Sequence, residues 1–325
     1  MEQNIKTFYL QKMNSIIRHL KIYKKDVSQT GISIALINIL WFVRKYIPKN
    51  LFSSLMRKKH WLLERKIADV VEAVSALPMP VVRQKHIFEK SPIWFCWLQG
   101  QDNLLPITQM CLNSIRKNCN NHPVVFIDLQ TYKDYIALPA NIVRLFEASK
   151  IGYAHFADII RTCLLYHYGG CWIDSTILVT KELDETLFQS IFYSVKLSPD
   201  SFFVSRARWS NFFLACQAGN PIMGHTLALF YKYLTIKDYF IDYFMMDYLM
   251  DMVIRENVTL ENQIEAIPYN NPNVHRLKNH LEEACTTERL NNIIGDTYIH
   301  KLSWKNCMGT PNPNTIYSYF YNLYR

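Results

Sequence analysis

The chain has 325 residues, of which 50% are hydrophobic and 14% aromatic, so it is long enough to bury a large core. Glycine is scarce and no repeat or low-complexity tract is present, which excludes fibrous and disordered proteins. The formal net charge is +9, but residues 1–66 alone carry 14 Lys/Arg and 3 Asp/Glu, a net of +11. The charge therefore belongs to the N-terminal segment and predicts an anionic partner there.

Three helices are expected at the start of the chain, over residues 3–25, 32–47 and 51–74, where apolar residues recur at helical spacing. Lys, Arg and aromatic residues alternate in these segments, which is typical of helices that lie in a membrane interface. An ordinary helical appendage with solvated lysines explains the pattern equally well. No nucleic-acid motif accompanies the charge. The partner expected for residues 1–75 is therefore an anionic membrane surface, with no nucleic acid.

The cysteines and the N-terminus predict a cytoplasmic protein. Eight cysteines form no CxxC pair and no zinc-site spacing, so they are expected to be free thiols in a reducing compartment. The first residues do not form a secretory signal, and the uncharged run 27–43 is too short and polar to span a bilayer. If the N-terminal segment binds lipid, the protein lies on the inner face of the plasma membrane.

The sequence after Pro78-Met79-Pro80 alternates between strands and helices, and it predicts a basic helical region at 1–77 followed by a main domain at 78–325. Such alternation favours an α/β sheet flanked by helices. In chain order we expect a strand at 93–98, a helix at 107–118, a strand at 123–128, helices at 132–135 and 153–168, strands at 171–174 and 212–216, and helices from 221, at 238–255 and at 315–324.

Asp174 is the strongest candidate for a functional residue. It ends an apolar strand that follows Gly169-Gly170, and ligands of open α/β sheets bind at that end of the strands. Asp158 and Arg161 are three residues apart on the preceding helix, so they share a face. An exposed ion pair worth a few tenths of a kcal/mol is the simpler explanation for that pair. Its helix leads directly to Asp174, however, which favours a shared site.

Three segments together resemble a known family. They are Ile-Trp-Phe-Cys-Trp-Leu-Gln-Gly at 93–100, Ala-Asp-Ile-Ile-Arg at 157–161, and Tyr-Gly-Gly-Cys-Trp-Ile-Asp-Ser-Thr at 168–176. Over residues 90–305 the chain resembles the capsular polysaccharide synthesis proteins, relatives of the family 32 glycosyltransferases. The resemblance implies a GT-A-like, Rossmann-type mixed sheet. It also implies transfer of a sugar, with retention of configuration, from a nucleoside-diphosphate sugar, most readily a UDP-sugar, to a saccharide or lipid-linked saccharide acceptor in capsular or other surface polysaccharide synthesis.

The resemblance also implies roles for individual residues. Asp174, Asp158 and Arg161 match catalytic positions, and Trp97 matches a position that stacks on the nucleobase, although a core tryptophan in a buried strand is as common. Apart from the resemblance, Asp247 lies in the helix expected at 238–255 and is expected to contact the acceptor, unless it is a solvated helix-face charge. The expected substrate-binding residues are Trp97, Gln99, Asp158, Arg161, Trp172, Asn211, Asp247, Ser303, Trp304 and Lys305.

The metal site departs from the wider superfamily, because Thr176 replaces the second acid of the Asp-x-Asp element. Asp174, Thr176 and His300 are the expected ligands of Mn²⁺ or Mg²⁺, since a diphosphate supplies further oxygens. Lys301 and Lys305 are further candidates for neutralising the leaving diphosphate. The missing acid leaves a second function open: a membrane-associated scaffold that binds saccharide or nucleotide in a polysaccharide assembly complex, without turnover.

Overall fold

The computed structural model describes residues 27–40, 44–68, 77–197, 203–305 and 309–325. Its centre is a five-stranded sheet with the strand order β2–β1–β3–β6–β5. Strand β1 pairs in parallel with β2 and β3, whereas β6 is antiparallel to β3 and β5. The strands are β1 (Ile93–Cys96), β2 (Val124–Ile127), β3 (Gly170–Asp174), β5 (Phe192–Ser194) and β6 (Phe213–Cys216), and a separate antiparallel pair joins β4 (Ile177–Val179) to β7 (Ile299–Lys301). The predicted α/β class with a mixed sheet is confirmed.

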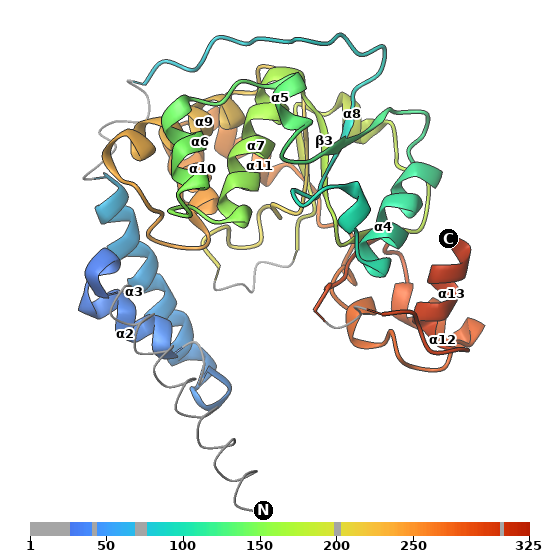
Figure 1. Cartoon of the computed structure of the whole chain (residues 1–325). Coiled ribbons are helices and arrows are strands. Elements are labelled where there is room, and N and C mark those ends of the chain that lie inside the picture. The colour runs from blue at the N-terminus through green and yellow to red at the C-terminus, as the bar shows by residue number, and fades with distance from the viewer. Residues whose placement is uncertain (1–26, 41–43, 69–76, 198–202, 306–308) are drawn as a thin grey trace, which may run out of the picture.

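Both faces of the sheet are covered, which explains why its strands are continuously apolar. Trp94 of β1 belongs to a core shared with helices α7, α9 and α10. Phe95, the next residue, belongs to a second core on the opposite face, shared with helices α4 and α8. Figure 1 shows these helices around the sheet. Their bounds are α4 (Pro106–Lys117), α7 (Tyr153–Tyr168), α8 (Thr186–Gln189), α9 (Pro221–Ile236) and α10 (Met245–Arg255).

Most predicted elements are confirmed within a few residues, including α5 (Tyr132–Tyr135) and the C-terminal α13 (Ile316–Leu323). The long helix expected at 238–255 is wrong in its first part, because α10 begins only at Met245. The Asp242 carboxylate accepts a hydrogen bond from the Phe244 amide at 2.9 Å and closes a turn before the helix. Short elements were not predicted: β4, β5, β7, α8, α6 (Ala140–Glu147), α11 (Val258–Glu265), α12 (Thr287–Ile294), η3 (Gln101–Asn103) and η4 (Leu277–Asn279).

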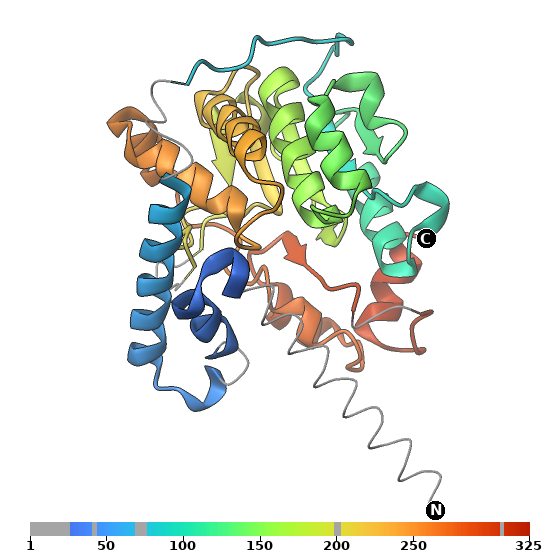
Figure 2. The ribbon, with the colours of Figure 1, turned by 60° about the vertical axis from the view of Figure 1, so that its left-hand side comes forward.

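The N-terminal part forms a helical hairpin of α2 (Ile32–Leu40), η1 (Arg44–Tyr46) and α3 (Lys49–Ala68), which extends from the body of the molecule (Figures 1 and 2). The helix expected at 3–25 and the end of the one expected at 51–74 lie outside the described residues. The far end of α3 reaches the main domain: Leu63 and Ile67 join the core that contains Trp94. Among the described residues, no helix is both long and apolar enough to cross a bilayer.

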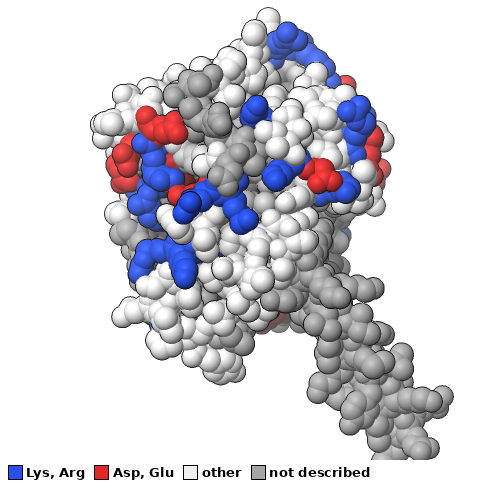
Figure 3. Space-filling model, turned by 90° about the vertical axis from the view of Figure 1, so that its left-hand side faces the viewer, with Lys and Arg blue, Asp and Glu red and all other residues white. Residues whose placement is uncertain are grey.

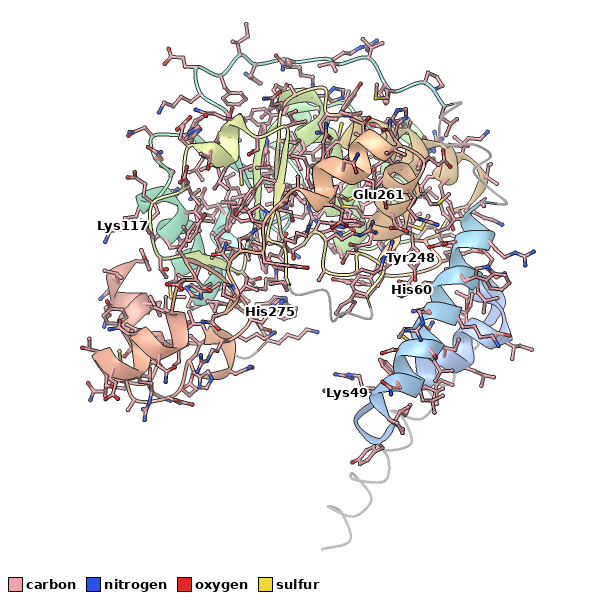
Figure 4. All side chains as sticks on the ribbon, turned by 180° about the vertical axis from the view of Figure 1, so that it is seen from behind. Lys49, His60, Lys117, Tyr248, Glu261 and His275 are labelled. Carbon is pink, nitrogen blue, oxygen red and sulfur yellow. The ribbon has the colours of Figure 1, made fainter. Side chains whose placement is uncertain are left out.

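One ion pair and one aromatic contact fix α3 to the main domain. The Lys59 ammonium lies 2.7 Å from the Asp242 carboxylate, and both side chains are largely buried. The His60 ring packs edge-on against Tyr248 of α10, with ring centroids 5.6 Å apart (Figure 4). The hairpin is therefore docked on the segment 242–255 rather than tethered freely.

The Gly169-Gly170 pair joins α7 to β3 through a turn that only glycine fits. Both residues have positive φ, 68° and 85°, and the Gly169 amide donates to the Leu165 carbonyl to end the helix, as predicted. A Cβ on Gly170 would lie 2.1 Å from the Pro92 carbonyl oxygen. The Trp94 indole also donates to the Gly169 carbonyl at 2.9 Å. This turn fixes α7 against β3, and with it the distance from Arg161 to Asp174.

Replacing Gly170 with Ala is expected to lower the free energy of unfolding by at least about 2 kcal/mol, because the new methyl group meets backbone and the positive φ adds strain. Urea denaturation measures the change. Gly309→Ala is the matched control, since no atom lies within 4 Å of its Cβ position, and it should change stability by about 0.5 kcal/mol or less. Equal stability of the two variants would contradict this account of the turn.

Candidate active site

A cavity of about 970 Å³ lies at the carboxyl end of β3. The adjacent ends of β5 and β6 and the first turn of α10 contribute to its wall, as expected for ligand sites at the edge of an α/β sheet. The residues that line it are Asp158, Arg161, Asp174, Lys196, Leu197, Phe203, Ser205, Ala207, Trp209, Ser210, Asn211, Phe212, Tyr243, Phe244, Asp247, Tyr269, Asn270, Pro272, Val274, His275 and Lys301.

Asp174 lies at the centre of an ionic cluster in this cavity. Its Oδ1 accepts from the Arg161 guanidinium at 3.2 Å and from the Trp172 indole at 2.8 Å. Its Oδ2 accepts from the Lys301 ammonium at 2.8 Å. Lys301 comes from β7, 127 residues further along the chain. Burial alone would raise the pKa of Asp174, but the charges of Lys301 and Arg161 and the hydrogen bonds outweigh it and lower the pKa to about 2.

Arg161 connects Asp174 to the second predicted acid. One guanidinium nitrogen lies 3.3 Å from the Asp158 carboxylate, another pairs with Asp174, and the group stacks 4.7 Å from the centre of the Trp172 ring. The Arg161 side chain is 7% exposed. Fixed in this way, it behaves as a positioned charge of the cavity floor and not as a solvated ion pair.

A third acid, Asp247, faces the same cavity from α10. Its carboxylate accepts from the Trp209 indole at 2.9 Å and from the Asn211 amide at 2.8 Å. The Asn211 Oδ1 is buried and has no hydrogen-bond partner among the described residues. Buried acceptors are normally paired, so this oxygen is suited to receive a hydroxyl of a ligand.

Asp158 and Asp247 titrate near neutrality. Burial raises the pKa of both carboxyls from 3.8 to about 7, against the charge of Arg161. Strongly perturbed acids in a cavity are a feature of catalytic and binding sites. Each can hold or release a proton at physiological pH, whereas Asp174 remains ionised.

The structure brings six predicted residues together and leaves others apart. Asp158, Arg161, Asp174, Asn211 and Asp247 line the cavity, and Trp172 supports it from beneath: it is 1% exposed, so it positions Asp174 and Arg161 and does not itself reach a ligand. Trp97 donates its indole N–H to the Asn103 carbonyl, and Gln99 is exposed in the following turn. The remaining predicted residues, Ser303, Trp304 and Lys305, follow β7 and do not line the cavity; Trp304 is exposed.

His300 and Thr176 require a correction, because neither shares a ligand position with Asp174. Successive side chains of a strand point to opposite sides, so Lys301 faces Asp174 while His300 faces away. His300 is fully buried, and its Nε2 lies 3.4 Å from the Thr180 hydroxyl. Burial lowers the pKa of His300 to about 4. Thr176 is 5% exposed and lies outside the cavity lining.

Several lining residues were not predicted from the sequence. The loop 269–275 contributes Tyr269, Asn270 and His275, and the turn before α10 contributes Tyr243 and Phe244. Figure 4 marks His275, whose ring packs edge-on against Phe212 at 5.7 Å. The cluster of Asn and Pro in 269–275 is a signal for a loop, but only the fold shows that this loop borders the same cavity.

The raised pKa of Asp247 predicts how stability depends on pH. When the pKa of a carboxyl is higher in the folded state than in the unfolded state, the free energy of unfolding falls as the pH rises between the two pKa values. For Asp247 this range is from about 4 to about 7. Asp247→Asn removes this loss, and the new amide can still accept from Trp209. Relative to wild type, the variant should therefore gain on the order of 2 kcal/mol between pH 5 and pH 8, measured by thermal unfolding.

Asp238→Asn is the matched control for this pH dependence. A hydrogen bond from Lys150 lowers the pKa of Asp238, so this carboxyl is ionised in both folded and unfolded states throughout that range. The difference between this variant and wild type should therefore stay constant from pH 5 to pH 8. A constant difference for Asp247→Asn as well would contradict the raised pKa.

The comparisons with known proteins identify the family. No curated protein matches the chain. Among solved structures, one entitled "PaToxG Glycosyltransferase" aligns with 77% of this chain and 99% of its own, with 14% sequence identity and a TM-score of 0.39. The family described as capsular polysaccharide synthesis protein matches residues 45–320, which include the whole of α3 and every residue that lines the cavity. The chain belongs to the capsular polysaccharide synthesis protein family.

Proposed function

We propose that this protein is a glycosyltransferase that moves a sugar from a nucleoside-diphosphate sugar, a UDP-sugar in the first instance, to a saccharide or lipid-linked saccharide acceptor. The observation that carries the proposal is the ionic cluster around Asp174, because Arg161 and Lys301 pair with this carboxylate in a cavity that Asp158 and Asp247 also line. Cations bind and stabilise phosphate oxygens, and carboxylate and amide oxygens bind sugar hydroxyls. Family membership supports the same reaction class.

The cavity offers a place for each part of such a donor. Tyr243 and Tyr269 line it and are 66% and 61% exposed, so their rings are available to stack on a base or a sugar. The free Oδ1 of Asn211, beside Asp247, is available to a sugar hydroxyl. Trp97 remains a predicted base-stacking residue outside this cavity.

In the proposed reaction the bond between the anomeric carbon and the diphosphate oxygen breaks, and its electron pair leaves on the diphosphate. The acceptor hydroxyl oxygen bonds to the anomeric carbon and loses its proton. Asp158 or Asp247 is suited to receive that proton, because both titrate near neutrality. The pairing of Arg161 with Asp158 and Asp174 holds the cavity floor in place while the charge moves.

A non-catalytic scaffold that binds nucleotide or saccharide is the alternative. The single acid at the end of β3 favours it, whereas two acids with pKa values near 7 in one cavity favour catalysis. A scaffold would need a cavity but no proton acceptor. Binding of nucleotide sugar with no turnover under any condition would establish this alternative.

Asp174→Asn is expected to reduce turnover of the donor by at least about 100-fold, because the neutral amide no longer pairs with Arg161 and Lys301. A panel of nucleotide sugars, screened by thermal shift, identifies the donor, and release of nucleoside diphosphate measures turnover. Asp134→Asn, on the exposed surface of α5, is the control and should keep wild-type turnover. Wild-type turnover in Asp174→Asn would remove the central claim.

We also propose that the helical hairpin binds an anionic membrane surface on the cytoplasmic side. Ile32, Leu36 and Ile39 form one stripe on α2 and are 64%, 50% and 44% exposed. Exposed basic residues of α3 lie nearby: Lys49, Arg57, Lys58, Arg65 and Lys66. Figure 3 shows this side of the molecule, where Lys and Arg are spread over the upper and middle part of the view with Asp and Glu among them. An apolar stripe beside basic residues is the arrangement of interfacial helices.

Replacing Ile32, Leu36 and Ile39 with Ser should reduce recovery with anionic liposomes in a flotation assay, because each buried aliphatic side chain contributes about 1.5–3 kcal/mol. The control replaces three aliphatic residues of similar exposure elsewhere: Ile191, Ile236 and Val258. Equal flotation of the two triple variants, or no flotation of wild type, would contradict membrane binding through the hairpin.

A further inference from the structure

The Asp174 carboxylate is poorly suited to hold a resident divalent metal. Arg161 and Trp172 donate to its Oδ1 and Lys301 donates to its Oδ2. Both oxygens therefore already accept hydrogen bonds from N–H groups, two of which carry a positive charge. Mg²⁺ and Mn²⁺ require oxygen ligands with free lone pairs directed at the ion. A metal at this carboxylate would have to displace the Lys301 ammonium or bind close to it.

Among the described residues, the other predicted metal ligands do not compensate for this. His300 faces the other side of β7, and Thr176 is buried outside the cavity. Asp158, which borders the same cluster, is paired with Arg161 at 3.3 Å. Within the part of the chain that the structure describes, no group of three His, Cys, Asp or Glu side chains is arranged to hold an ion. The donor set therefore does not fit the metal that the fold family implies.

Lys301 is instead held as a fixed cation on the cavity wall. Its backbone amide donates to the Val274 carbonyl at 2.7 Å, which anchors β7 beside the loop 269–275. Its ammonium lies 5.4 Å from the centre of the Phe212 ring and 2.8 Å from Asp174. The side chain is 23% exposed, so the group still reaches the cavity. An ammonium has three N–H donors, and Asp174 accepts one of them.

Lys196, the other lysine that lines the cavity, has no N–H donor left for a ligand. Lys196 donates to the carbonyls of Ile264 and Glu265 and to the Glu265 carboxylate, at 2.9 to 3.3 Å. All three of its donors are therefore used within the fold. Lys301 is the lysine of the described cavity lining that keeps donors for a ligand.

We propose that Lys301 takes the place of a divalent metal: its ammonium binds the diphosphate of the donor and neutralises the leaving group. The inference rests on the proposed glycosyl transfer. When the bond from the anomeric carbon to the diphosphate oxygen breaks, the electron pair stays on that oxygen. The added negative charge then lies beside the Lys301 ammonium. Asp174 and Phe212 hold the ammonium in position.

Calorimetric titration of the full-length wild-type protein tests this directly. The probes are nucleoside diphosphates and the corresponding monophosphates of uridine, guanosine, cytidine, adenosine and thymidine, each titrated in EDTA and in Mn²⁺. The diphosphate that binds is expected to have the same Kd in both buffers within about twofold, and to bind tighter than its monophosphate even in EDTA.

The outcomes separate this inference from the proposed function. A diphosphate that binds only in Mn²⁺, or at least about tenfold tighter there, overturns the inference and leaves glycosyl transfer standing. If no nucleotide binds in either buffer, the proposed function fails and the inference fails with it. These measurements on wild type do not depend on any variant folding correctly.

Three variants then test whether Lys301 causes the preference for diphosphate over monophosphate. Lys301→Met keeps the length of the side chain and removes its charge, and it should reduce the preference for diphosphate over monophosphate by about tenfold or more. Lys301→Arg keeps the charge and should keep most of the preference. Lys232→Met removes an exposed charge on α9, outside the cavity, and should bind like wild type. An unchanged preference in a folded Lys301→Met, checked by circular dichroism, would overturn the inference.

Discussion

The ion pairs that meet at Asp174 hold the site together. Arg161 belongs to the helix before β3, and Lys301 belongs to β7, 127 residues beyond Asp174, so one carboxylate joins segments that are far apart in the sequence. Removing charges from water costs several kcal/mol per ion, and good geometry with further hydrogen bonds is needed to repay it. The Trp172 indole and the stacked guanidinium provide that geometry. The glycine turn at 169–170 sets the spacing, which is why the local backbone and the site depend on each other.

The local parts of this arrangement could be predicted from the sequence, and the distant parts could not. Asp158, Arg161 and Asp174 lie within 17 residues, so helical spacing and the glycine turn were enough to place them together. The strands β1 and β3 were also predictable, because a continuous apolar run indicates burial on both faces. By contrast, β7 has only three residues and no periodic signal in the sequence. Which of His300 and Lys301 faces Asp174 therefore depends on the register of β7 against β4, which the sequence does not show. A shift of one residue would exchange their directions.

The hairpin and the cavity share one structural segment. Asp242 binds Lys59 of α3, Tyr248 packs against His60, and between them Tyr243, Phe244 and Asp247 line the cavity. At the end of α10, Arg255 lies 3.2 Å from Glu64 of α3. The predicted boundary at residue 77 therefore separates two regions that pack against each other, and the family match, which begins at residue 45, includes the helix that makes these contacts. The segment 242–255 therefore contacts both the hairpin and the cavity.

The charges of the cavity explain why a site with one acid at the end of β3 and a lysine beside it disfavours a metal ion. Two carboxylates at the end of β3 would attract a doubly charged ion, whereas Asp174 alone is already balanced by Arg161 and Lys301. Two unit charges of the same sign about 4 Å apart repel by about 4 kcal/mol at an effective dielectric constant of 20, so a metal beside both side chains would be opposed by each of them. A diphosphate meets the opposite balance. Burial raises the pKa of both Asp158 and Asp247, which disfavours their ionised form and so lowers the negative charge that faces a ligand. With Thr176 in place of the second acid, this charge balance supports the proposed binding of a diphosphate without a metal.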